Sequence, residues 1–133
     1  MAGSIRDLSK YRYEKSIEQI KVAETLIQNE MYSVALNRAY YAIFHAMRAV
    51  NALDDFDSSK HSGVIAHFNQ YHVKTGEFGR NTLRIIRNAA DLREQADYED
   101  FYIADAIEAK DILDKAKQFI TEVEAYLRQH GVI

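Results

Sequence analysis

The residues best suited to chemistry are an arginine and a histidine on one predicted helix, Arg38 and His45. Both stand in the most apolar stretch of the chain, where a charged side chain is costly unless it has a partner. At about 100° per residue their separation spans about 700°, so both lie on one helix face, about 10.5 Å apart along the axis. A guanidinium and an imidazole in this arrangement can contact one phosphate group. The alternative interpretation is that each pairs with an acidic side chain of another helix.

Three further arginines form a second candidate site. Arg80, Arg84 and Arg87 are spaced by four and three residues, which places them on one face of a helix. Such a basic stripe can bind a phosphate backbone or an acidic partner. Acidic residues between positions 94 and 108 could instead neutralise the stripe within the fold or across a dimer. The sequence leaves both interpretations open.

Metal and cofactor chemistry find little support in the residue pattern. His61, His67 and His72 lack the i,i+4 spacing of a helical metal-binding pair, and no carboxylate completes a ligand set, so we expect no metal site. The absence of cysteine excludes a disulfide scaffold, a thiolate zinc site and a cysteine nucleophile. There is no phosphate-binding glycine loop, nucleophile elbow or dinucleotide fingerprint, and we expect no cofactor.

The composition is that of an ordinary globular protein. The chain has 133 residues, 47% hydrophobic and 28% charged, which predicts a single domain over residues 1–133. No apolar run approaches the roughly 20 residues that cross a bilayer, and the N-terminus lacks a signal-peptide core, so we expect a cytoplasmic protein without membrane contact. The net charge of −3 excludes a uniformly basic nucleic-acid coat but allows a local basic site.

The chain has no proline and only five glycines, which favours long helices, and apolar residues recur with helical spacing throughout. Ser4 and Asp7 have the spacing of a capping box, and Gly131 is a typical stop signal. We predict helices over about 7–29, 31–53, 60–74, 80–95 and 104–130. The predicted fold is all-α, an up-and-down bundle of four to five helices.

The predicted second helix differs from the others because apolar residues surround it on every side, which is typical of a central, buried helix. If two copies packed antiparallel about a two-fold axis near Tyr41 and Ala42, residue 38 of one copy would face residue 45 of the other. The small side chains that would allow this approach are Ala39, Ala42, Ala46 and Ala49. We therefore consider a composite site in a homodimer.

The stretch Asn37-Arg38-Ala39-Tyr40-Tyr41-Ala42-Ile43-Phe44-His45-Ala46 resembles HEPN domains (higher eukaryotes and prokaryotes nucleotide-binding), in particular their small stand-alone prokaryotic branch. Residues 60–65 and 93–98 match further stretches of that branch in the same order. The resemblance covers nearly the whole chain. It implies an HEPN-like helical bundle that usually dimerises.

The resemblance also implies a function. Many HEPN proteins are metal-independent endoribonucleases, often toxins paired with a small nucleotidyltransferase antitoxin. Arg38 and His45 match the family's ribonuclease motif, and Asn37 supplies a polar neighbour. We accordingly expect Arg38 and His45 to be catalytic and Asn37 to bind the RNA or nucleotide beside them. We expect Arg80, Arg84 and Arg87 to bind flanking phosphates of RNA, and Tyr40 or Tyr41 to stack a base. The alternatives are a non-catalytic nucleotide-binding or adaptor module and a purely structural helical dimer.

Overall fold

The computed structural model describes residues 4–133, and every regular element in that range is helical, as the sequence predicts. The elements are α1 (Ile5–Gln28), α2 (Tyr32–Ala52), α3 (His61–Phe68), the π-helical turn η1 (Asn69–Val73), α4 (Thr82–Tyr98) and α5 (Ala106–Gln129). Most of the helix boundaries differ from the predicted ones by one to three residues. None of the helices among residues 4–133 is long and apolar enough to cross a membrane.

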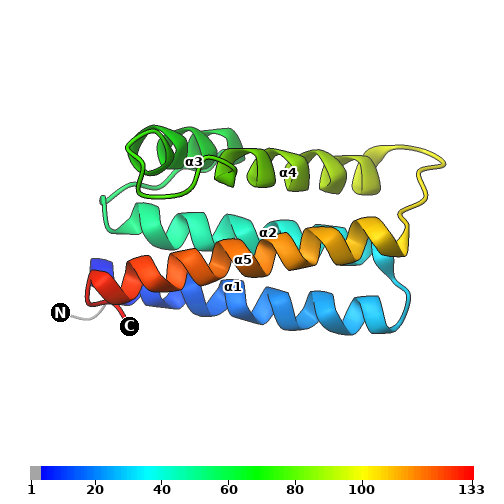
Figure 1. Cartoon of the computed structure of the whole chain (residues 1–133), viewed down its shortest axis with the longest axis horizontal. Coiled ribbons are helices and arrows are strands. Elements are labelled where there is room, and N and C mark those ends of the chain that lie inside the picture. Colours follow the sequence, from blue (N-terminus) through cyan, green and yellow to red (C-terminus); the bar gives the residue numbers. More distant parts are fainter. Residues whose placement is uncertain (1–3) are drawn as a thin grey trace.

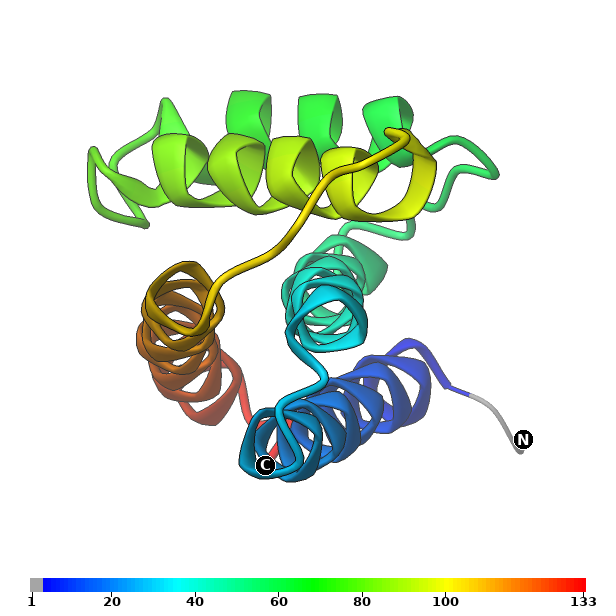
Figure 2. The ribbon, with the colours of Figure 1, turned by 90° about the vertical axis from the view of Figure 1, so that its right-hand side faces the viewer.

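The three longest helices, α1, α2 and α5, lie alongside one another, and Figure 2 looks along all three. The chain runs along α1, returns along α2, advances through α4 and returns along α5, which is the predicted up-and-down order (Figure 1). The segment α3–η1 departs from that order. Both α3–η1 and α4 run across the long helices in Figure 2, and together they form a second layer above α2 and α5.

Helix α2 is the centre of the bundle, in contact with α1, α3, α4 and α5. It is buried because apolar side chains leave its axis in every direction, so neighbours on several sides shield it from water. Its buried apolar residues are Ala35, Leu36, Ala39, Tyr40, Ala42, Ile43, Phe44, Ala46, Met47, Ala49, Val50 and Ala52. The central position predicted for this helix is confirmed.

The alanines of α2 are not free to meet a second copy, contrary to our expectation. All four are at most 1% exposed within one chain: Ala39, Ala42, Ala46 and Ala49. Helix α1 also buries small residues, among them Ser9 and Ser16. The Ser9 hydroxyl donates to the Ala49 carbonyl oxygen at 2.6 Å. The small side chains therefore allow close packing of α1 on α2 inside the protomer.

The cap of α1 forms as the sequence predicts. The Ser4 hydroxyl accepts from the Asp7 backbone N–H at 3.1 Å, and the Asp7 carboxylate accepts from the Ser4 backbone N–H. At the other end of the chain, Gly131 has a φ of +72°, which glycine adopts without strain and which ends α5.

The connection between α4 and α5 carries exposed apolar side chains. Phe101 is 100% exposed, Ile103 is 87% exposed and Ile107 is 82% exposed. Helical periodicity predicts that Ile107 belongs to the buried stripe of the last helix, and that prediction is wrong. Ile107 lies in the first turn of α5, and Ala109 is the first buried residue of that helix.

Candidate functional site

Four partly buried side chains form a stripe on the outer face of α2: Arg38, Tyr41, His45 and Arg48. The steps of three, four and three residues keep them on one side of the helix, while the positions between them face the core. We call this set the α2 outer stripe. Sequence spacing predicts the shared face of Arg38 and His45, and the structure adds Arg48 to it. The structure brings Tyr41 between them: the Arg38 guanidinium lies 5.2 Å from the Tyr41 ring centre, which is 6.3 Å from the His45 ring centre.

Arg38 is held by neutral side chains. Its Nε donates to Asn37 Oδ1 at 2.9 Å, Nη2 contacts the same oxygen, and Nη1 donates to Gln19 Oε1 at 3.1 Å. Asn37 in turn donates to Asp97 Oδ2 at 2.8 Å, which fixes its amide. Because amides rather than a carboxylate surround the guanidinium, its positive charge is not neutralised by an ion pair within residues 4–133.

His45 lines a cavity of about 430 Å³ between α1 and α2. The other lining residues are Leu8, Tyr11, Arg12, Lys15, Gln19 and Arg48. The imidazole makes no hydrogen bond to any residue in the described range. Burial lowers the pKa of His45 to about 4, and the nearby charges of Arg48, Lys15, Arg12 and Arg38 add to this effect. The ring is therefore neutral at pH 7 and stands in a positively charged pocket.

Asp57, in the loop after α2, orients two of these cations. Its Oδ2 lies 3.1 Å from Arg12 Nη2 and 2.9 Å from Arg48 Nη2. Arg12 is only 7% exposed and also donates to the Arg48 carbonyl oxygen. The hydrogen bond from Arg48 is the main reason why the pKa of Asp57 is lowered. Asp57 does not line the His45 cavity, and among residues 4–133 it makes no hydrogen bond to the His45 imidazole.

Tyr40 does not have the free ring that base stacking requires. It is 1% exposed, and its ring packs against Tyr41, Phe44 and His61. Its hydroxyl lies 2.9 Å from His61 Nδ1, and burial raises the pKa of Tyr40 to about 12. Tyr40 is thus a core residue that joins α2 to α3. The stacking prediction remains for Tyr41, which is only partly buried.

Sequence reasoning missed Arg93 of α4. Its guanidinium lies 5.3 Å from the Tyr40 ring centre and 5.5 Å from that of Tyr41, and Nη2 donates to the Tyr41 hydroxyl at 3.3 Å. Arg93 Nε is 3.2 Å from Asp97 Oδ2 but lacks the alignment of a hydrogen bond. Arg93 thus extends the positive charge beside Tyr41. Its position in the stretch matched to HEPN domains was the available signal.

The arginines Arg80, Arg84 and Arg87 line a different cavity, of about 1320 Å³, with Asn88 of α4 and Lys115 of α5 among its other lining residues. We call it the α4–α5 groove. No carboxylate among residues 4–133 forms an ion pair with any of the three arginines, while Asp97 approaches Arg93 instead. The groove shares no lining residue with the His45 cavity. The sequence predicts the stripe but not its separation from His45.

Two of the three histidines meet a carboxylate that the sequence pattern did not connect with them. His67 and His72 both contact the carboxylate of Asp54, so the three side chains lie together. His61 takes no part and faces Tyr40. The spacing argument assumed an uninterrupted α-helix, whereas the chain forms the π turn η1 at this place.

The cations around His45 were also missed. Arg12 and Lys15 share one face of α1 with the neutral Gln19, because the three are spaced by three and four residues. Nothing in the sequence says that this face of α1 borders His45. Arg48 was within reach of sequence reasoning, because it continues the series Arg38, Tyr41 and His45 by one more step.

The fold and the α2 outer stripe define a class: small all-α bundles with an arginine and a histidine paired on the central helix. The HEPN domain family matches residues 9–126. A protein of Methanocaldococcus jannaschii named "Putative toxin MJ0605" is 33% identical over 125 residues, which are 94% of this chain and 92% of the relative. "Putative toxin MJ0142" of the same organism is 29% identical over 96% of this chain and 86% of its own length.

A "UPF0332 protein" of Thermotoga maritima is 31% identical over 115 residues, 86% of this chain and 87% of that protein. The family match covers most of the chain, and relatives above 30% identity align over nearly their full length. The chain belongs to the HEPN domain family, and two of its relatives carry names of toxin type.

Proposed function

We propose that this protein is a metal-independent endoribonuclease that acts on RNA as a homodimer, with His45 and Arg38 as catalytic residues. The observation that carries the proposal is the His45 cavity. An imidazole held neutral at pH 7 stands there among cations, with no carboxylate bonded to it. An unprotonated base beside positive charge suits a polyanionic substrate.

In the proposed reaction, neutral His45 takes the proton from a ribose 2′-hydroxyl, and the 2′-oxygen attacks the adjacent phosphorus. The bond from phosphorus to the 5′-oxygen breaks, and the protonated imidazole returns its proton to that oxygen. Arg38 stabilises the negative charge that builds on the phosphoryl oxygens, because its guanidinium stays protonated at any working pH. The products are a 2′,3′-cyclic phosphate and a 5′-hydroxyl.

The dimer in this proposal uses the α2 outer stripe rather than the buried alanines. Tyr41 lies midway between positions 38 and 45 on this stripe. A two-fold axis beside Tyr41 would set residue 38 of one copy opposite residue 45 of the other, so that both copies complete each phosphate site. The partly buried side chains of the stripe leave this face available.

The toxin names of two relatives support a toxin-type role. The small nucleotidyltransferase partner is proposed from the resemblance to HEPN domains alone. Expression of the wild-type chain should then arrest growth, and His45→Ala should not. Arg38→Ala should also abolish arrest while the fold and the dimer persist.

The direct test is cleavage of a single-stranded RNA by the purified chain with and without EDTA. We expect unchanged cleavage in EDTA, cyclic-phosphate ends, and at least a hundredfold loss in His45→Ala. His130→Ala removes an exposed histidine far along the chain and should retain full activity. Equal cleavage by His45→Ala and wild type would refute the assignment. Nucleotide binding without cleavage would favour the adaptor alternative, and loss of the dimer in Arg38→Ala would favour a structural role.

A further inference from the structure

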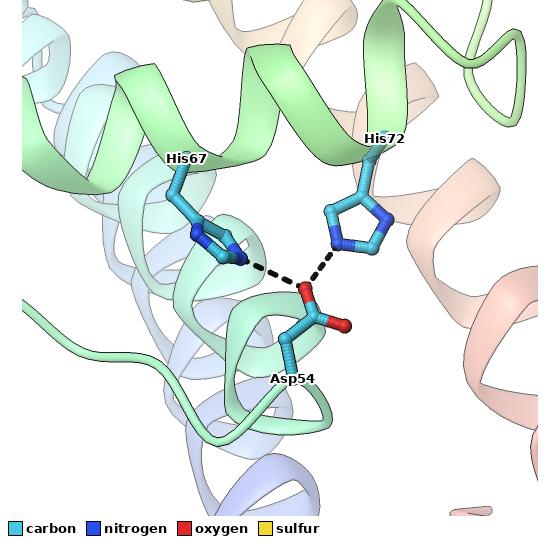
Figure 3. A group of neighbouring side chains, drawn as sticks. All are labelled: Asp54, His67 and His72. Carbon is cyan, nitrogen blue, oxygen red and sulfur yellow. Dashed lines mark hydrogen bonds and ion pairs between the residues drawn. The ribbon is translucent and has the colours of Figure 1, made fainter.

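Outside the α2 outer stripe, two histidines converge on one carboxylate oxygen. His67 Nε2 lies 2.9 Å from Asp54 Oδ2, and His72 Nε2 lies 2.6 Å from the same atom. Figure 3 shows both imidazoles extending from one side of the α3–η1 segment toward Asp54, which follows the end of α2. The three ligand atoms all lie within 4.8 Å of one another. We call Asp54, His67 and His72 the α3–η1 cluster.

The π turn is what brings the two histidines together. In an α-helix, residues five apart point about 140° away from each other. In η1 the backbone instead bonds five residues back, as in the bond from Lys74 N–H to the Asn69 carbonyl oxygen at 2.9 Å. The wider turn rotates His72 onto the side of His67. π turns of this kind occur frequently at functional sites.

Both ring nitrogens of His72 face carboxylate oxygens, which fits either an imidazolium that donates from both nitrogens or a neutral ring with a cation at Nε2. A neutral imidazole has one N–H and one lone pair, yet Nε2 faces Asp54 and Nδ1 lies 2.6 Å from Glu77 Oε1. For the neutral ring, a metal ion at Nε2 resolves this arrangement, because Nδ1–H then donates to Glu77. Histidines that bind metals regularly donate their second ring N–H to a carboxylate in this way, which fixes the ring.

Packing fixes the rings while the carboxylate stays accessible. The His67 ring stacks on Phe56 with centres 3.9 Å apart, and Tyr126 meets the His72 ring edge-on at 5.7 Å. The His72 side chain is 3% exposed, whereas that of Asp54 is 33% exposed. A small ion can thus reach preoriented ligands from the Asp54 side. A four-coordinate ion holds its ligand atoms about 3.3 Å apart, so the two pairs of atoms now at 2.9 and 2.6 Å would open by less than about 1 Å.

We propose that Asp54, His67 and His72 bind one divalent transition-metal ion of the Zn²⁺ class, with Glu77 as the positioning residue of His72. Two imidazoles and one carboxylate suit Zn²⁺ and leave a fourth position for water. The ion would fasten the segment after α2 to α3 and η1. The site lies beyond the end of α2, away from His45, so the proposed cleavage remains independent of metal.

The test uses the full chain without a histidine tag, stripped with a chelator and dialysed against Zn²⁺ alone. We expect one Zn²⁺ per chain by mass spectrometry, and a melting temperature raised by about 10 °C when free Zn²⁺ is about 100 times Kd. Asp54→Asn and His67→Gln should each weaken binding at least tenfold. Glu77→Gln should weaken it by about 10- to 100-fold, as expected of a carboxylate that orients a ligand.

The matched control is Asp55→Asn, which makes the same change of charge at the neighbouring exposed position and should bind Zn²⁺ as the wild type does. His72 itself is left unchanged in this series because its buried ring packs in the core. Co²⁺ provides a second readout, since four-coordinate Co²⁺ with these ligands gives visible absorption that Asp54→Asn should abolish. Equal Zn²⁺ binding by Asp54→Asn and wild type would overturn the proposal, as would loss of the bound ion in His130→Gln or no binding by the wild type.

Discussion

Arg48 and Asp57 form a two-point ion pair, with Nε 3.2 Å from Oδ1 and Nη2 2.9 Å from Oδ2. The same Oδ2 also accepts from Arg12, so one carboxylate sets the positions of two cations. Both cations line the cavity of His45. The electrostatic character of that cavity therefore depends on a residue that lies outside it.

Asp57→Asn should destabilise the fold, because Arg12 would keep its buried charge and lose its anionic partner. We expect a loss of about 1–3 kcal/mol in the free energy of unfolding, measured by urea denaturation. Asp55→Asn is the control, since that carboxylate takes no part in the pair, and it should change stability by less than about 0.5 kcal/mol. Equal stability of the two variants would show that solvent satisfies Arg12.

The His45 imidazole should titrate near pH 4 in the free protein. Nuclear magnetic resonance of its ring carbon resonances measures this midpoint directly. A bound phosphodiester should raise the pKa, because its negative charge favours the imidazolium. We expect the midpoint to rise by at least one unit on addition of a non-cleavable RNA analogue. An unchanged pKa of His45 on RNA binding would show that the phosphate does not bind beside this imidazole.

The lowered pKa of His45 also predicts a stability profile. The unfolded chain binds a proton near pH 6.5 and the folded chain only near pH 4, so the unfolded state holds more protons between these values. Stability should be full above about pH 6.5, fall as the pH drops toward 4, and change no further below it from this group. Allowing for solvent screening, the contribution is about 1–2 kcal/mol. Urea unfolding of His45→Gln across this range should lack that part of the slope.

The burial of the α2 alanines can be tested by overpacking. Ala46 is 0% exposed within one chain, so Ala46→Leu should cost about 1–3 kcal/mol in unfolding free energy. If the alanines met a second copy instead, the substitution would weaken dimerisation and leave the monomer intact. Denaturation together with sedimentation velocity separates these results.

The α4–α5 groove should bind RNA without taking part in cleavage. Arg87→Gln should weaken RNA binding and reduce the slope of log affinity against log salt by about 0.7 for a single strand. The single-turnover rate at saturating protein should stay at the wild-type value. Lys21→Gln, on α1, is the control for an unrelated exposed cation. If Arg87→Gln leaves the slope of log affinity against log salt unchanged, the α4–α5 groove does not bind RNA.

Periodicity predicted the helices because burial and helical spacing coincide along most of the chain. It failed at Ile107, where the helix begins before it reaches the core, and at residues 69–73, where the winding changes. Neither the exposure of Ile107 nor the π turn changes the spacing of apolar residues in the sequence. The role of the α2 alanines was misassigned for a related reason: small residues indicate close packing but do not say which helix approaches.

The candidate site was predictable where it lies on one helix and not where helices meet. Arg38 and His45 share a face by spacing alone. The positive surroundings of His45 come from α1 and from the loop that holds Asp57, and the contact of Arg93 with Tyr41 comes from α4. Side chains brought together by tertiary packing from distant segments have no common spacing that a sequence could display.

The π turn has a genetic consequence. A π turn is equivalent to one extra residue placed in an α-helix. Deletion of a single codon between His67 and His72, for example that of Gln70, would restore regular winding and leave the spacing at i,i+4. Helices of relatives that differ here by one residue in length can therefore be aligned only by allowing a gap inside the helix.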